Sequence, residues 1–88
     1  MRRRKVAFKP SAERSLQHLP TEIQKRLVIA AEELADEPRP PGARKLSGEH
    51  GIWRVRVGAY RMIYEIDDPQ QMVMVLRIAH RKDAYRKG

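Results

Sequence analysis

The chain has 88 residues, which suits one small domain with one modest core, and we treat residues 1–88 as a single domain. It has no cysteine, which excludes disulfides and thiolate metal sites, and no apolar run approaches the length of a membrane helix. Nineteen Lys and Arg against eleven Asp and Glu give a net charge of +8. We therefore expect a cytoplasmic protein with a polyanionic partner, whether RNA, DNA or an acidic protein.

The N-terminal part predicts one strand and two helices. Residues 4–9 alternate as in a short strand, and Ser11 is a suitable N-cap for a helix over residues 12–18. A second helix is predicted over residues 21–36, whose first residue and Gln24 have the form of a capping box. Its apolar residues recur at helical spacing: Ile23, Leu27, Ala30, Ala31 and Leu34.

The C-terminal part predicts three strands. Prolines in residues 38–42 indicate a rigid connection, and we expect residues 44–50 to form a loop. Two alternating stretches then flank Gly58, whose place suits the first position of a two-residue type II′ turn. A last strand over residues 72–79 is largely apolar on both faces, which predicts a central, covered strand.

A two-residue turn at Gly58 and Ala59 fixes the register of the hairpin, which then has one apolar face and one basic face. It pairs Val57 with Tyr60, Arg56 with Arg61, and Trp53 with Tyr64. The apolar face would carry Trp53, Val55, Val57, Tyr60, Met62, Tyr64 and Ile66, and we expect its aromatic rings to lie in the core rather than stack on bases.

The basic face carries Arg54, Arg56 and Arg61. Like charges opposite each other on neighbouring strands destabilise a hairpin by roughly 0.2–1 kcal/mol, so an ordinary solvated surface is the weaker interpretation. An anion site is favoured, and phosphate is the anion we expect, since guanidinium groups match phosphate oxygens.

The predicted fold is α+β. Two N-terminal helices pack on one face of a small, mostly antiparallel four-stranded sheet, in the order strand-helix-helix-strand-strand-strand. The arginine face of the hairpin would then be the open face of the sheet.

Together with this layout, three motifs resemble the RelE/ParE superfamily of toxin–antitoxin toxins, and the RelE branch most closely. The first is Lys45-Leu46-Ser47-Gly48. The second runs from Trp53 to Ile66 and contains Gly58-Ala59-Tyr60-Arg61-Met62-Ile63-Tyr64, and the third runs from Ile78 to Tyr85 and contains His80-Arg81-Lys82-Asp83-Ala84-Tyr85. The resemblance covers essentially the whole chain. It implies a RelE-like, microbial-RNase-like endoribonuclease that cuts mRNA in the ribosomal A site, with a cognate antitoxin, the ribosome and mRNA as partners and without cofactor or metal.

The resemblance also implies roles for single residues. Arg61 would clamp the scissile phosphate, Arg81 would stabilise charge and assist the leaving group, and Tyr85 would stack on or orient the nucleotide. Arg54 and Arg56 occupy positions where RelE proteins carry lysines. Further cations expected to bind RNA phosphates are Lys45, Arg77, Lys82 and Arg86, although the stem of Arg77 could merely cover the sheet edge.

Because Arg54 stands where RelE proteins carry a lysine, the residue that accepts the 2′-proton is left open. Arginine stays protonated, so Arg54 is a poor base, and His80 or His50 could take the proton instead. Glu49 is interpreted mainly as a surface residue. The three histidines lack companion ligands at metal spacing.

Two other functions stay open: a ParE-type inhibitor of DNA gyrase, and an inactive member that only binds RNA or antitoxin.

Overall fold

The computed structural model describes residues 3–46 and 51–80. Five strands and two helices follow one another in these ranges. In chain order they are β1 (Lys5–Phe8), α1 (Pro10–Gln17), α2 (Thr21–Asp36), β2 (Arg44–Lys45), β3 (Ile52–Val57), β4 (Tyr60–Asp67) and β5 (Met72–His80). No helix in the described ranges is long and apolar enough to cross a membrane.

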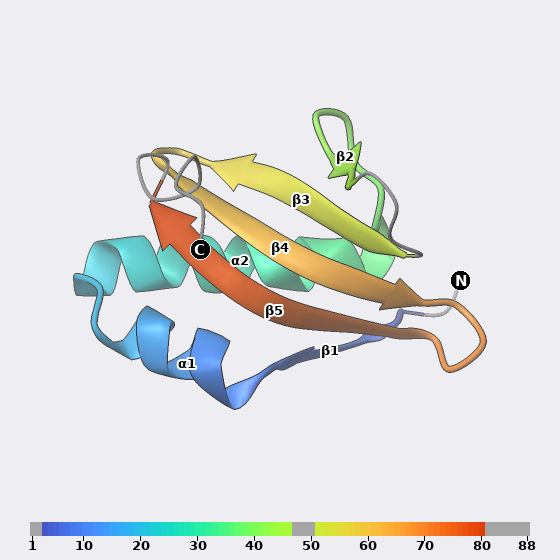
Figure 1. Cartoon of the computed structure of the whole chain (residues 1–88), viewed down its shortest axis with the longest axis horizontal. Helices are drawn as coiled ribbons and strands as arrows, with labels where there is room; N and C mark the ends of the chain where they lie inside the picture. Colours follow the sequence, from blue (N-terminus) through green and yellow to red (C-terminus); the bar gives the residue numbers. More distant parts are fainter. Residues whose placement is uncertain (1–2, 47–50, 81–88) are drawn as a thin grey trace.

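The strands form one mixed sheet in the order β1-β5-β4-β3-β2 (Figure 1). β1 runs parallel to β5, and the other neighbours are antiparallel. The expected four-stranded, mostly antiparallel sheet is therefore wrong. The fifth strand is β2, because Arg44 and Lys45, expected to lie in a loop, pair with Arg54 and Trp53 of β3.

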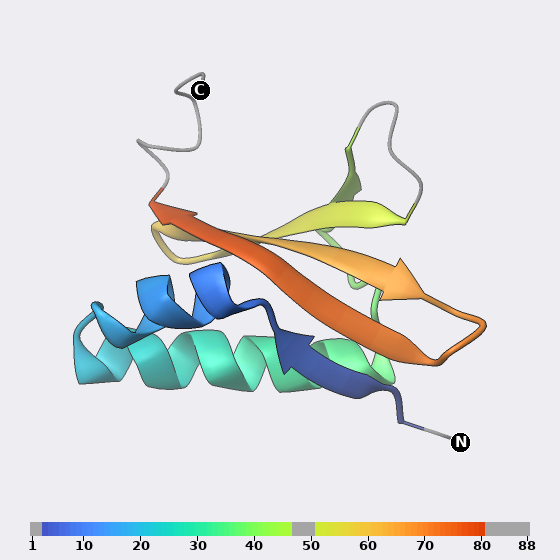
Figure 2. The ribbon, with the colours of Figure 1, turned by 60° about the horizontal axis from the view of Figure 1, so that its bottom comes forward.

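Both helices lie on the same side of the sheet (Figure 2). We call the opposite side the open face. Helix α2 buries Leu27, Ala31 and Leu34 against the sheet, and each fully buried leucine contributes roughly 1.5–3 kcal/mol. The predicted apolar stripe of this helix is thus confirmed, with Ile23 and Ala30 packed against the buried residues.

Neither helix begins with the predicted side-chain cap. Helix α1 starts at Pro10 with Lys9 as its N-cap, and α2 has Pro20 as its N-cap. Proline suits the first turn of α1 because the N–H it lacks would have no partner there. The side-chain amide of Gln24 donates instead to the backbone oxygen of Leu19, at 2.7 Å.

The β3–β4 hairpin has the predicted register. The observed pairs include Val57 with Tyr60, Arg56 with Arg61, and Trp53 with Tyr64. Gly58 has φ of +60°, as the first central residue of a type II′ turn requires. The predicted apolar face points towards the helices, where Met62, Tyr64 and Ile66 are buried and Trp53, Val55, Val57 and Tyr60 pack against them.

β5 lies between β1 and β4, which confirms that it is a central strand. Its pairing with β4 shifts by one residue: Tyr64 pairs with Val75, but Ile63 pairs with Arg77, so Leu76 is an extra residue. This β-bulge changes which residues share a face. Val75 is buried beneath the helices, while Arg77 faces the open side with Ile63.

Candidate phosphate-binding face

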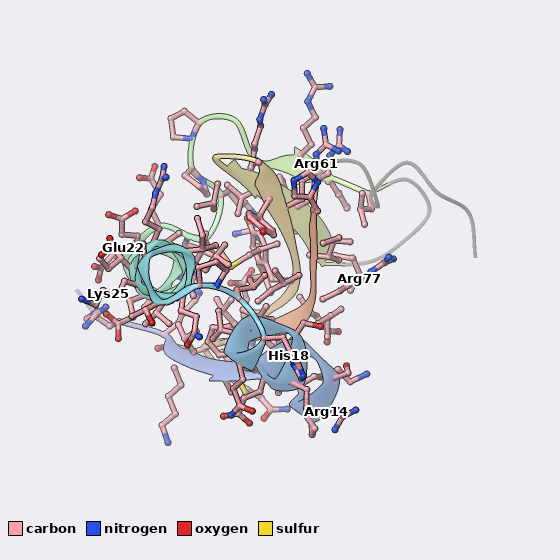
Figure 3. All side chains as sticks on the ribbon, turned by 90° about the vertical axis from the view of Figure 1, so that its left-hand side faces the viewer. Arg14, His18, Glu22, Lys25, Arg61 and Arg77 are labelled. Atoms are coloured by element: carbon pink, nitrogen blue, oxygen red, sulfur yellow. The ribbon has the colours of Figure 1, made fainter. Side chains whose placement is uncertain are left out.

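The basic residues of the hairpin lie on the open face of the sheet. Figure 3 shows Arg61 and Arg77 on the side facing away from α2, whereas the labelled residues of α1 and α2 lie elsewhere on the molecule. Residues directly opposite each other on neighbouring strands share a face, with Cβ atoms about 4.5–5.5 Å apart. The strand pairing therefore shows which side chains form this surface.

Two neighbouring rows cross the sheet. The first runs from β2 to β5 and contains Arg44, Arg54, Ile63 and Arg77. The second contains Arg56, Arg61 and Ala79. We call these two rows the arginine face.

The arginine face is strongly positive. Ion pairs between described residues join Arg3 to Asp36, and Arg4 and Arg39 to Asp68. The row beyond Ile63 brings Glu65 opposite Ile52, and no acidic residue lies within the two rows. The positive charges of the described residues are therefore concentrated on the side of the sheet that neither α1 nor α2 covers, where they would attract an anion.

Individual arginines differ in how firmly they are held. The Nη1 atom of Arg61 is buried, and Arg56 donates from Nε to the backbone oxygen of Gly58 at 3.3 Å. Arg26 of α2 also approaches the hairpin turn, because a Cβ atom on Gly58 would lie 3.5 Å from its Nη2. The turn therefore gathers cations from the sheet and from a helix.

The proline-rich connection holds β2 against the sheet. The hydroxyl of buried Tyr64 donates to the backbone oxygen of Pro38 at 2.7 Å. Burial raises the pKa of Tyr64 to about 12, and the charge of Arg39 opposes this rise. The guanidinium of Arg39 lies 5.5 Å from the ring centre of Trp53, a cation–π distance.

Asp68, in the β4–β5 turn, links Arg39 of this connection to Arg4, which precedes β1. It accepts hydrogen bonds from Arg4 at 2.9 Å and from Arg39 at 3.1 Å. These bonds, first that of Arg4 and then that of Arg39, lower the pKa of the Asp68 carboxyl. The connection that precedes β2 is therefore anchored by contacts with β3, with β4 and with the β4–β5 turn.

The predicted site residues do not all lie together. Arg54, Arg56, Arg61 and Arg77 share the open face. Lys45 is opposite Trp53 and so belongs to the other face. The remaining predictions, Arg81, Lys82, Tyr85 and Arg86, lie outside the described residues, as do the alternatives Glu49 and His50.

His80 is also separated from the arginine face. It pairs with Tyr60, on the face opposite to Arg61, and the two rings meet edge to face with centres 5.1 Å apart. It lines a hollow of about 600 Å³ between α1 and β5, together with Ser11 and Ser15. Within residues 3–46 and 51–80, no three His, Cys, Asp or Glu side chains form a group that could hold a metal ion.

Sequence reasoning missed Arg44. Two residues are too few for an alternating pattern, and the prolines before them favour a loop. The only sequence signal is that a cation precedes the hairpin at a distance that allows a third strand to pair.

Comparisons with known proteins identify the family of this chain. Residues 6–85 match the family model of the ParE toxin of type II toxin–antitoxin systems. The chain is 37% identical over 83 residues to toxin RelG of Mycobacterium tuberculosis, covering 93% of this chain and 95% of RelG. It is 31% identical to toxin RelE3 of Methanocaldococcus jannaschii, covering 92% and 94% of the two chains.

A solved structure gives the same picture. The toxin–antitoxin complex RelBE2 from Mycobacterium tuberculosis contains a chain that matches with a TM-score of 0.82 and 36% identity, covering 94% of this chain and 97% of that one. The chain therefore belongs to the RelE/ParE superfamily of toxins of type II toxin–antitoxin systems.

Proposed function

We propose that this toxin is a ribosome-dependent endoribonuclease that cuts mRNA in the A site and so stops translation in the cytoplasm. The observation that carries the proposal is the arginine face: its two rows concentrate guanidinium groups on the open side of the sheet. Guanidinium groups bind phosphate oxygens in a bidentate manner, which suits a nucleic-acid backbone better than a small neutral ligand.

The reaction would be an attack by a ribose 2′-oxygen on the adjacent phosphorus. A bond forms between the 2′-oxygen and phosphorus, and the bond from phosphorus to the 5′-oxygen of the next nucleotide breaks. The products are a 2′,3′-cyclic phosphate and a 5′-hydroxyl, so the 2′-proton is lost and the leaving oxygen gains one. No metal or cofactor is needed for this balance.

Within this reaction, Arg61 would clamp the scissile phosphate and stabilise the charge that develops on it. Arg54 and Arg56 lie beside it on β3 and would add further positive charge. Because arginine remains protonated, these residues would stabilise charge rather than accept the 2′-proton. The resemblance assigns charge stabilisation also to Arg81 and orientation of the nucleotide to Tyr85.

His80 is less well placed for proton transfer than its sequence position suggested, because it shares the face of Tyr60 rather than that of Arg61. The described part of the open face carries no histidine. We therefore propose that the described residues of this face supply binding and charge stabilisation.

A cognate antitoxin is the expected protein partner. The similar chain in Mycobacterium tuberculosis was solved in a toxin–antitoxin complex. With a net charge of +8, this toxin would be matched by an acidic or amphipathic segment that covers the arginine face. Antitoxin and RNA would then compete for the same arginines.

Primer extension on an mRNA under translation in a reconstituted system tests the proposal. Wild-type toxin should produce cuts at A-site positions, and naked mRNA should stay intact. Folded wild-type protein that leaves translated mRNA uncut would contradict the proposal, and supercoiling by DNA gyrase would then be assayed.

A further inference from the structure

We propose that Arg44 of β2, which lies at the edge of the arginine face beyond Arg54, is an additional RNA-phosphate contact. The proposal rests on the RNA-cleaving function above. It assigns this role to Arg44 in place of its neighbour Lys45, because the two residues of β2 face opposite sides of the sheet.

The strand pairing places Arg44 on the correct side. Arg44 lies directly opposite Arg54 in the antiparallel β2–β3 pair, so their side chains share the open face. Lys45 lies opposite Trp53, which packs towards the helices. Both β2 side chains are exposed, so they differ in direction rather than in access to solvent.

The backbone around β2 is held on both sides. The amide of Ala43 donates to the oxygen of Pro40 at 3.0 Å, and the amide of Leu46 donates to the oxygen of Ile52 at 2.9 Å. The bond from Tyr64 to Pro38 anchors the preceding connection. Arg44 is therefore presented by fixed backbone, which lowers the entropy cost of binding a phosphate.

The charges around Arg44 favour an anion. Arg44 and Arg54 lie opposite each other on neighbouring strands, and neither forms an ion pair with another described residue. Such like-charged pairs are unfavourable in a sheet that only needs a solvated surface. A bound phosphate between or beside the two guanidinium groups would relieve this repulsion.

The row also gives the direction of the RNA. From Arg44 to Arg77 it crosses three strand spacings, which is about 14 Å at about 4.8 Å per spacing. Ile63 in the middle of the row offers apolar surface to a base. We therefore infer that the RNA backbone runs across the strands, with Arg44 on a phosphate outside the scissile one.

The experiment compares Arg44→Ala with Lys45→Ala, a matched control that removes the same charge from the neighbouring residue. Binding of the full chain to a single-stranded RNA, with the reacting 2′-hydroxyl replaced by hydrogen, is measured by fluorescence anisotropy at several salt concentrations. Arg44→Ala should weaken binding severalfold and reduce the slope of log affinity against log salt by about 0.7. Arg44→Lys should keep the slope, and Lys45→Ala should behave as wild type.

Cleavage of ribosome-bound mRNA gives a second readout. Since Arg44 would contact a phosphate outside the scissile one, Arg44→Ala should raise KM and leave kcat unchanged. Unchanged melting temperatures would show that the variants are folded. Displacement of RNA by an oligoglutamate peptide serves as the test for a protein partner.

Each outcome decides between the proposals. Equal losses for Arg44→Ala and Lys45→Ala, or no loss for either, would overturn the role of Arg44 while leaving the RNA-cleaving function intact. If Arg44→Ala weakens the displacement of RNA by oligoglutamate but leaves RNA binding unchanged, Arg44 would be assigned to a protein partner and its role in RNA binding would be overturned. Wild-type protein that neither binds RNA in a salt-dependent manner nor cuts translated mRNA would overturn the proposed function as well.

Discussion

Arg56 of β3 lies directly opposite Arg61 of β4, one pair away from the hairpin turn. Two like charges in this position oppose hairpin formation by roughly 0.2–1 kcal/mol. Arg56 is partly held by its hydrogen bond to the oxygen of Gly58, and one nitrogen of Arg61 is buried. The hairpin thus keeps two cations at a cost in stability, as is common where a surface is used for binding.

Replacement of Arg56 should therefore stabilise the fold and weaken the function. Arg56→Thr should raise the free energy of unfolding in urea by roughly 0.2–1 kcal/mol, because the opposed charge is removed. The same variant should bind RNA more weakly. Arg77→Thr is the control: it makes the same exchange in a strand, but Arg77 lies opposite Ile63 and not opposite a cation. An equal gain in both variants would assign the effect to strand propensity.

Arg61 should be the described residue on which cleavage depends most. Arg61→Ala should reduce the cleavage rate on ribosomes about 10²–10³-fold, since it removes a group that stabilises charge in the transition state. Single-turnover cleavage of ribosome-bound mRNA measures this rate. Arg14→Ala removes an exposed cation from α1, away from the arginine face, and should cut at the wild-type rate. A comparable loss in Arg14→Ala would point to overall charge rather than to a site.

The hairpin was predictable because its pattern is long and its turn is marked. Alternation on both sides of Gly58 fixes every pair, since a slip of one residue would turn the apolar face to solvent. The caps were not predictable in the same way, because a proline at the start of α1 needs no side-chain cap. The fifth strand was missed because Arg44 and Lys45 form a strand only through pairing with β3.

The site was predictable to the extent that it follows the alternation. Arg54, Arg56 and Arg61 were placed on one face by parity alone. Arg77 reaches the same face through the bulge at Leu76, which no local pattern in β5 indicates. The motif that contains Lys45 drew attention to that lysine, whereas the register puts Arg44 beside Arg54.

The hydroxyl of Tyr64 should matter for stability. Tyr64→Phe leaves the buried oxygen of Pro38 without this donor, so the free energy of unfolding should fall by about 1–3 kcal/mol. Urea denaturation measures it. Tyr60→Phe is the control, because the Tyr60 hydroxyl makes no hydrogen bond to any other described residue. If both variants lose equally, the bond to Pro38 contributes little.

The Tyr64 hydroxyl should also make stability fall as the pH rises into the alkaline range. Burial raises the pKa of Tyr64 from 10.0 to about 12, so the folded chain holds this proton to a higher pH than the unfolded chain does. Its contribution to stability is complete below about pH 10 and is lost as the pH rises towards 12. Tyr64→Phe should therefore lose less stability than wild type over this range, as measured by urea denaturation at each pH.

Asp68 with its partners Arg4 and Arg39, here called the Asp68 cluster, should make stability fall as the pH is lowered into the acid range. Hydrogen bonds from Arg4, and then from Arg39, lower the pKa of Asp68 below its ordinary value of 3.8, so the unfolded chain takes up this proton first as the pH falls. The contribution of the cluster is complete above the ordinary pKa and is lost as the pH falls through the lowered one. The free energies of unfolding of wild type and Asp68→Asn, measured by urea denaturation, should therefore differ at neutral pH and converge in strong acid.

Glu22→Gln is the control, because it removes an exposed carboxylate of α2 that has no ion pair to other described residues. Its free energy of unfolding should stay close to that of wild type at neutral pH. A gap between wild type and Asp68→Asn that is equally large in strong acid would show that the loss comes from packing, and that the charges on Arg4 and Arg39 do not carry it.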